Sequence, residues 1–296
     1  APKKNMKRKL STSLGRAPFI VGHREATDRG LRVLVRTYAR GCTLTSSFRF
    51  CRGLASDWLR SSGLASSSSA PAKMSSSTKW LPLETNPEVL TRFLRKGGVP
   101  SPYGIADVLG LDDELLGMVP QPVEALVVLF PTTASFPPKE PGASSTAYFT
   151  EQHIGDACGA IALLHCVFNS SDVDLVPGSP FEKFYEATKT SDPAARGRAL
   201  IDADDIKDLS NETARQGESA GAGTQDNQCQ HFVSFANVDG KVVELDGRNA
   251  GPVVHGDTSQ KTFLADAAKV IQRDFIQRDP TNLHFSVLAF CRLLEE

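Results

Sequence analysis

Two alternating segments joined at Asp239-Gly240 constrain the fold of this chain more than any other feature. Residues 231–246 read HFVSFANVDGKVVELD, with apolar side chains recurring at alternate positions on both sides of the Asp-Gly pair. Asp-Gly favours a two-residue type I′ turn, because both central residues of that turn need a positive φ. The pattern therefore predicts an antiparallel hairpin in which the numbers of paired residues sum to 479.

This register brings two chemically useful side chains together. Asp246 falls opposite Val233, and His231, two residues along the same strand, shares the face of Val233. Diagonal cross-strand neighbours are close enough for long side chains to touch. We expect one nitrogen of His231 to donate its proton to Asp246 and the other to be free to act as a base.

The remaining patterns predict helices and strands without a βαβ repeat. Asn86 can cap a helix that has Pro87 at its first position and ends at Gly97-Gly98. The other expected elements are short helices at 112–116 and 180–187, a strand at 125–130, a buried helix at 156–168, a long polar loop at 191–229, a helix at 262–276 and a strand at 283–290. The expected class is α+β with antiparallel pairing.

Cys158 lies in the first turn of the helix expected at 156–168. A cysteine at a helix N-terminus that faces an imidazolium has its thiolate favoured both by the backbone dipoles and by the ion pair. Gln152 precedes it by six residues, so its side-chain amide and the backbone N–H of Cys158 can face one developing negative oxygen. These residues predict a nucleophile, Cys158, a base, His231, an orienting acid, Asp246, and an oxyanion-stabilising amide, Gln152.

The same residues resemble the motifs of a known family. The run of Gln152, then 156–159 (Asp-Ala-Cys-Gly), then His231-Phe, then 244–248 (Glu-Leu-Asp-Gly-Arg) is similar in order and spacing to the ubiquitin C-terminal hydrolases. Residues 80–87 (WLPLETNP) resemble the N-terminal segment of that family, and residues 255–258 (HGDT) resemble the turn that follows its aspartate. The resemblance covers residues 79–296.

The resemblance implies a fold and an activity. The fold would be a papain-like, deeply knotted chain with a central antiparallel sheet wrapped by helices, and residues 211–228 would form an active-site crossover loop. The activity would be hydrolysis of the bond after the C-terminal glycine of ubiquitin, with small or unfolded leaving groups. Nedd8 stays open as a second partner. We expect a monomer that needs no cofactor and no metal.

Two other functions stay open from the sequence. One is a catalytically inert ubiquitin-binding module, which would bind ubiquitin tightly without turnover. The other is a papain-like peptidase of ordinary peptides, which would cleave short peptides that carry no folded ubiquitin.

Charge divides the chain at about residue 78. Residues 1–78 carry 15 Lys and Arg against 3 Asp and Glu, whereas the remaining residues carry 18 against 31. The basic part is rich in Ser and Arg, which predicts a disordered leader, either an organelle transit peptide or a segment upstream of a true start at Met74.

The acidic body at 79–296 repels phosphate, so no nucleic-acid partner is expected. No apolar run reaches the length of a membrane span, and a cytoplasmic location is expected.

The other cysteines and the acidic clusters receive structural interpretations. Six cysteines are too few for a disulfide scaffold in a chain of 296 residues. We expect Cys166 and Cys291 to fill the core, and Cys229 to be a weaker candidate for the nucleophile because no helix dipole acts on it. The aspartates at 202, 204, 205 and 208 fit a solvated helical face better than a cation site.

Overall fold

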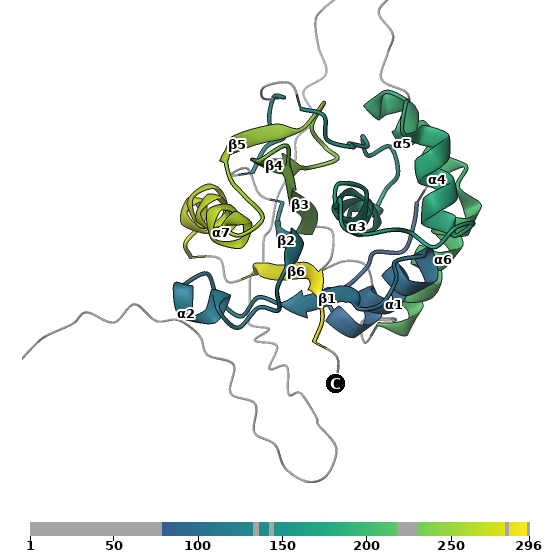
Figure 1. The fold of residues 1–296 in the computed structure, drawn as a ribbon. Coiled ribbons are helices and arrows are strands. Elements are labelled where there is room, and N and C mark those ends of the chain that lie inside the picture. Colours follow the sequence, from purple (N-terminus) through teal and green to yellow (C-terminus); the bar gives the residue numbers. More distant parts are fainter. Residues whose placement is uncertain (1–78, 133–135, 142–144, 218–229, 282–283, 295–296) are drawn as a thin grey trace, which may run out of the picture. The chain divides into compact units, whose positions relative to one another are not determined.

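Six antiparallel strands form the centre of the computed structural model, which describes residues 79–294 except 133–135, 142–144, 218–229 and 282–283 (Figure 1). These residues belong to one compact unit. The helices are α1 (Pro87–Gly97), α2 (Asp113–Leu116), α3 (Cys158–Phe168), α4 (Pro180–Thr188), α5 (Pro193–Ile201), α6 (Asp204–Gln216), α7 (Phe263–Asp274) and the 3₁₀ helix η2 (Ile276–Arg278). The strands are β1 (Tyr103–Asp107), β2 (Val123–Pro131), β3 (Gln230–Val238), β4 (Lys241–Leu245), β5 (Val253–Asp257) and β6 (Ser286–Arg292).

The strands follow the order β1-β6-β2-β3-β4-β5, and each neighbouring pair is antiparallel. The predicted hairpin is confirmed in its register, since β3 and β4 pair from Val238 with Lys241 to Ser234 with Leu245. Asp239 and Gly240 have φ values of 50° and 72°, as a type I′ turn requires. The α+β class with antiparallel pairing is confirmed, and the knot stays a prediction.

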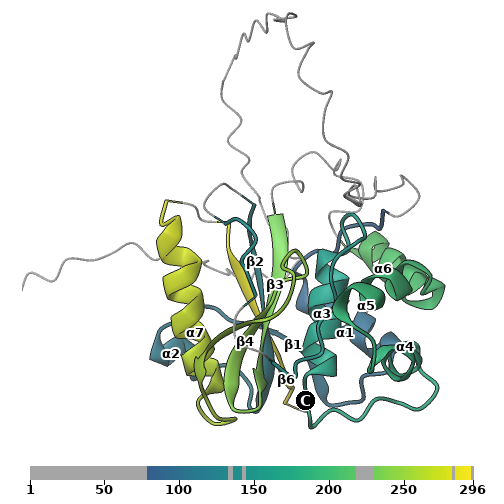
Figure 2. The ribbon, with the colours of Figure 1, turned by 90° about the horizontal axis from the view of Figure 1, so that it is seen from above.

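Helices cover both faces of the sheet (Figure 2). On one face α3 packs against β2 and β3, with α1, α4, α5 and α6 outside it; on the other face lie α2 and α7. Each face has its own apolar cluster, one around α3 and one around α7. Helix α3 is buried on nearly all sides, as its continuous apolar sequence predicts.

Side-chain caps explain where several helices begin. The Asn86 side chain accepts hydrogen bonds from the backbone N–H groups of Glu88 and Val89, and Gly98 ends α1 at a positive φ of 115°. Asp112 and Ser179 cap α2 and α4 in the same way. The helices predicted from Asn86, at 112–116 and at 180–187 are thereby confirmed.

The polar loop predicted at 191–229 is wrong for its first part. Asp192 caps α5 with Pro193 at the first position, and α6 follows directly. These two helices bury only a narrow apolar stripe, which includes Leu200, Ile206 and Leu209. The high content of polar residues concealed this helical spacing. The expected crossover loop at 211–228 is likewise helical up to Gln216, and its residues 218–228 lie outside the described residues.

Three smaller differences concern strands. Residues 255–258, expected as a turn, belong mostly to β5, which pairs with β4 at one edge of the sheet. Strand β6 covers 286–292 instead of 283–290, so His284 precedes the strand. Strand β1 had no counterpart among the predicted elements, because five residues provide little periodicity.

Candidate active site

Cys158 is the first residue of α3, and its position depends on a tightly fixed turn. Asp156 adopts a left-handed conformation with φ 58°, and its carboxylate pairs with Lys79 at 2.9 Å. No side chain of the described residues caps α3, so the first-turn N–H groups keep their positive field near the sulfur. The thiol is partly exposed.

Gly159 lets α3 approach the sheet closely. A Cβ at this position would lie 3.1 Å from the Leu83 Cβ and 3.3 Å from the Phe232 ring. Phe232 follows His231 in β3, so the close contact brings the helix N-terminus next to the histidine.

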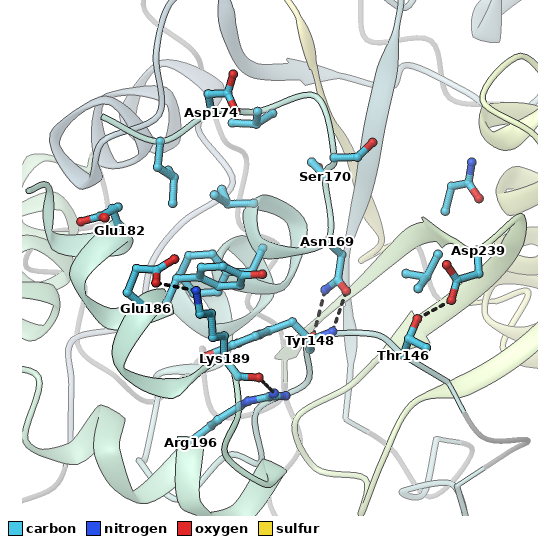
Figure 3. A pocket seen from close by; sticks show the side chains of 18 of the residues that line it. Thr146, Tyr148, Asn169, Ser170, Asp174, Glu182, Glu186, Lys189, Arg196 and Asp239 are labelled. Carbon is cyan, nitrogen blue, oxygen red and sulfur yellow. Dashed lines mark hydrogen bonds and ion pairs between the residues drawn. The ribbon is translucent and has the colours of Figure 1, made fainter. Parts of the chain in front are cut away.

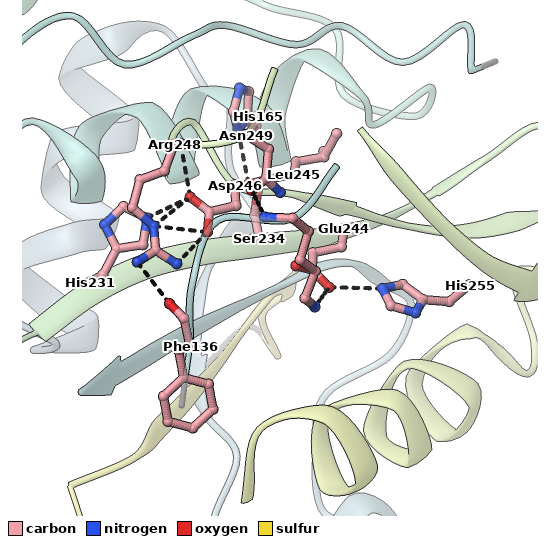
Figure 4. A network of polar contacts seen from close by, with 11 residues as sticks. Phe136, His165, His231, Ser234, Glu244, Leu245, Asp246, Arg248, Asn249 and His255 are labelled. Atoms are coloured by element: carbon pink, nitrogen blue, oxygen red, sulfur yellow. Dashed lines mark hydrogen bonds and ion pairs between the residues drawn. The ribbon is translucent and has the colours of Figure 1, made fainter. Parts of the chain in front are cut away.

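The structure joins His231 and Asp246 as the register predicts (Figure 4). His231 Nε2 lies 2.7 Å from Asp246 Oδ1, and both residues are buried. The Phe130 ring meets the imidazole edge to face, with 5.7 Å between ring centroids. Cys158 lies close enough to the same imidazole to help raise its pKa. Because Nε2 is bonded to Asp246, Nδ1 is the nitrogen left for the thiol.

The surroundings of this pair favour its charged form. Burial lowers the pKa of His231, but hydrogen bonds and charge interactions with Asp246 and Cys158 outweigh it, so the pKa is raised above its ordinary value. Burial raises the pKa of Asp246, yet His231 and Arg248 together hold it far below its usual range. An ionised Asp246 beside a protonatable His231 is the arrangement that activates a neighbouring thiol.

Arg248 is a residue of this site to which the sequence alone gave no role. Its guanidinium donates to Asp246 Oδ2 at 2.7 Å from Nη2, and its backbone N–H donates to Oδ1 at 2.9 Å. Its Nη1 donates to the Phe136 carbonyl at 3.4 Å. An arginine two residues beyond an aspartate, within one turn, was the available signal for this interaction.

Gln152 lies beside the turn that follows β4. Its backbone N–H donates to the Gly247 carbonyl at 2.8 Å, directly after Asp246. Its Nε2 donates to the Ile154 carbonyl at 3.1 Å, and its buried Oε1 has no hydrogen-bond partner among the described residues. An amide nitrogen carries two protons, so one remains available for a substrate oxygen.

His165 of α3 connects the segment before Gln152 to the residue before Asp246. Its Nε2 accepts from the Thr150 backbone N–H at 2.9 Å, so the ring proton is on Nδ1 and faces the Leu245 carbonyl at 3.3 Å. Complete burial lowers the pKa of His165 to about 4, which keeps the ring neutral. His165 therefore fills the core and also joins two parts of the site.

A second polar network lies beside the first (Figure 4). Glu244 is buried and accepts from Lys139 Nζ at 2.6 Å and from His255 Nε2 at 2.8 Å. The Lys139 backbone N–H donates to Asn249 Oδ1 at 2.7 Å, and the Asn249 N–H donates to the Asp246 carbonyl at 2.9 Å. The network fixes the turn that follows Asp246.

The other cysteines behave as predicted where they are described. Cys166 and Cys291 are fully buried, and burial raises the pKa of both thiols, to about 12 for Cys291. Cys229 lies outside the described residues. Over the described part of the chain, no group of three or more His, Cys, Asp or Glu could hold a metal ion, and no helix is long and apolar enough to span a bilayer.

Comparison with known proteins places this geometry in a family. Residues 80–276 match the family described as ubiquitin carboxyl-terminal hydrolase, family 1. The chain belongs to this family. A ubiquitin carboxyl-terminal hydrolase of Drosophila melanogaster is 37% identical over 221 residues, which cover 71% of this chain and 96% of that protein. Ubiquitin carboxyl-terminal hydrolase 3 of Arabidopsis thaliana is 38% identical, with coverage of 75% and 97%.

A solved structure of the ubiquitin carboxyl-terminal hydrolase family has the same fold. The catalytic domain of UCH37 from Trichinella spiralis, bound to ubiquitin vinyl methyl ester, aligns with a TM-score of 0.61 at 25% identity. The alignment covers 73% of this chain and 96% of that domain. The family resemblance found in the sequence is therefore confirmed, together with the fold that it implied at the level of the helix-flanked antiparallel sheet.

Proposed function

We propose that this chain is a thiol-dependent ubiquitinyl hydrolase. The observation that carries the proposal is the buried pair of His231 and Asp246, 2.7 Å apart, together with Cys158 at the first residue of α3, whose interaction with His231 helps to raise the pKa of the imidazole. Membership of the ubiquitin carboxyl-terminal hydrolase family supports ubiquitin as the substrate, and the solved neighbour was bound to a ubiquitin derivative.

The reaction would proceed in two stages. His231 takes the proton of Cys158, and the thiolate attacks the carbonyl carbon of ubiquitin's C-terminal glycine. The Gln152 amide and the Cys158 backbone N–H stabilise the oxyanion. As the intermediate collapses, the C–N bond breaks and His231 gives its proton to the leaving amine. A water molecule, deprotonated by His231, then attacks the thioester and restores the thiol.

The substrate proposal extends to what leaves ubiquitin. A tail ending in Gly-Gly suits a narrow cleft, because only residues without side chains let the backbone pass closely. We propose small or unfolded leaving groups, with Nedd8 as the competing modifier and a monomeric, cytoplasmic enzyme. N-terminal sequencing of the endogenous protein would separate a start at Met74 from an imported precursor.

The test is the release of a fluorophore from the C-terminus of ubiquitin by the full chain. Wild type and Cys229→Ala should turn over, whereas Cys158→Ala should lose at least about 10³-fold in kcat/KM, because the proposed thioester forms on the Cys158 sulfur. Fluorophore release by Cys158→Ala at the wild-type rate would refute the assignment.

Two substrate arms separate the competing functions. Tight ubiquitin binding without turnover by wild type would favour a binding module whose chemistry is dead. Cleavage of a short peptide without ubiquitin at a comparable rate would favour a general papain-like peptidase. Ubiquitin and Nedd8 substrates assayed side by side would give the preference between these modifiers.

A further inference from the structure

A cavity of about 760 Å³ lies at the C-terminal end of α3 (Figure 3). Helix α3 has 11 residues, so at about 1.5 Å per residue the cavity is about 15 Å from Cys158 along the helix. Its wall combines the end of α3, the loop that follows, helix α4, Arg196 of α5 and the β3–β4 turn. The volume is in the range of small-molecule sites, and none of the proposed catalytic residues lines it.

One wall of the cavity is aromatic. The rings of Tyr148, Phe168 and Tyr185 contact one another, with centroid distances between 4.8 and 5.5 Å. The Arg196 guanidinium already lies 4.1 Å from the centroid of the Tyr148 ring. The protein itself therefore uses this wall to hold a guanidinium, and the partly exposed Phe168 and Tyr185 rings remain to contact a second cation.

Arg196 is fully engaged within the fold. Its Nε, Nη1 and Nη2 donate to the carbonyls of Thr188, Phe149 and Lys189 at 3.1, 3.1 and 2.8 Å. Its donors therefore point at backbone oxygens, which makes it a structural residue of the aromatic wall and a poor anion receptor.

The charged groups at the cavity favour a cation. The carboxylates in the lining are those of Asp174, Glu182, Glu186 and Asp239, against two basic side chains. Lys189, one of these bases, is paired with Glu186 at 2.5 Å. The C-terminal end of α3 adds the negative end of its dipole.

An unpaired acceptor lies in the same lining. The Asn237 Oδ1 atom is buried and has no hydrogen-bond partner among the described residues. Buried polar atoms are normally paired, so this oxygen is suited to accept from an N–H group of a ligand.

We propose that this cavity binds the basic side chain, a guanidinium or an ammonium group, of an extended peptide segment of a partner protein. The cation lies against Phe168 and Tyr185, and the carboxylates around the entrance attract it. Arginine binds better than lysine, because its planar group stacks on aromatic rings and donates hydrogen bonds in several directions. The proposal is independent of the hydrolase reaction.

The test uses the full chain with ¹⁵N-labelled tyrosine. The chain has four tyrosines, of which Tyr148 and Tyr185 line the cavity and Tyr103 does not. Titration with acetyl-Gly-Arg-Gly-amide should shift the Tyr148 and Tyr185 amide signals and leave that of Tyr103 in place. The same peptide with citrulline, which keeps the shape without the charge, should bind at least about tenfold more weakly.

Matched variants complete the test. The Asp174→Asn/Glu186→Gln double variant removes two exposed charges of the cavity and should raise the peptide's Kd about fivefold. Asp205→Asn/Asp208→Asn removes two exposed charges from α6 and should leave the Kd unchanged. Ubiquitin hydrolysis should be the same in both double variants.

Three results would overturn the proposal. The first is equal binding of the arginine and citrulline peptides. The second is a shift of the Tyr103 signal instead of the signals of the cavity tyrosines. The third is no shift at 20 mM peptide, a concentration about twentyfold above a millimolar Kd, which is the weak end of specific binding.

Discussion

Asp246 is held by donors on both oxygens, which makes Asp246→Asn a sensitive test of the proposed site. Oδ1 receives His231 Nε2 and the Arg248 backbone N–H, and Oδ2 receives Arg248 Nη2. Asparagine offers one acceptor oxygen and one NH₂ group. Whichever way the amide turns, its NH₂ group must face a donor or force a change in the histidine.

Each orientation of the introduced amide has a definite consequence. If the NH₂ group faces Arg248, charge-assisted hydrogen bonds worth about 1.5–3 kcal/mol each are lost. If it faces His231, Nε2 must become an acceptor, and the ring proton moves to Nδ1, the nitrogen left for Cys158. We therefore expect a loss of about 3 kcal/mol in transition-state stabilisation, or roughly a hundredfold in kcat/KM.

The pH profile gives a second readout. Asp246 is a main cause of the raised pKa of His231, and burial alone would lower it. Without the carboxylate, the imidazolium loses its proton at a lower pH, so the alkaline limb of the kcat/KM profile should move toward acid. Asp257→Asn, at an exposed carboxylate on β5, should leave the rate and the limb unchanged.

A double variant tests whether the loss of activity in Asp246→Asn arises because the new NH₂ group faces the donors of Arg248. Arg248→Met alone should lower kcat/KM by about tenfold, because Asp246 loses its guanidinium partner. In Asp246→Asn/Arg248→Met the amide can turn its oxygen to His231, so the combined loss should be smaller than the product of the single losses. Strictly multiplicative losses, or an Asp246→Asn enzyme within threefold of wild type, would refute this reasoning.

Three further predictions follow from buried groups near the sheet. Because the pKa of buried His165 is lowered to about 4, the fold loses about 3 kcal/mol of stability as the pH falls from 6.5 toward 4. In urea unfolding, the free energy of unfolding of His165→Gln should fall less over this pH range than that of wild type. An equal fall in both proteins would contradict this. Burial raises the pKa of Glu124 to about 6. The neutral carboxyl group is favoured in the folded state, so its contribution to stability is lost as the pH rises through 6. Glu124→Gln should raise the free energy of unfolding at pH 8 by about 1–2 kcal/mol, because the buried carboxyl group is ionised there, and should change little at pH 4. An alanine Cβ at Gly247 would lie 3.1 Å from the Gln152 Cβ, so Gly247→Ala should lower kcat about tenfold with KM nearly unchanged, whereas Gly256→Ala, which has open space, should be neutral.

The hairpin shows how much of the site a sequence can predict. Strand alternation and an Asp-Gly turn fix the register, and the register alone brings His231 to Asp246. The contact of Cys158 with His231 needed more, because it depends on how closely α3 packs against β3 over Gly159. That distance is a property of tertiary packing, which local periodicity does not record. The family resemblance supplied it instead.

The parts that sequence reasoning missed are tied together through the backbone. His165 binds a backbone N–H of the segment that leads to Gln152 and the carbonyl of Leu245, and the Gln152 N–H binds the Gly247 carbonyl. Backbone atoms are the same at every residue, so such bonds leave no pattern in the sequence. A buried histidine in an apolar helix was the one visible sign, and core filling explains it equally well. The proposed active site therefore rests on side chains that the sequence predicts and on backbone contacts that only the fold reveals.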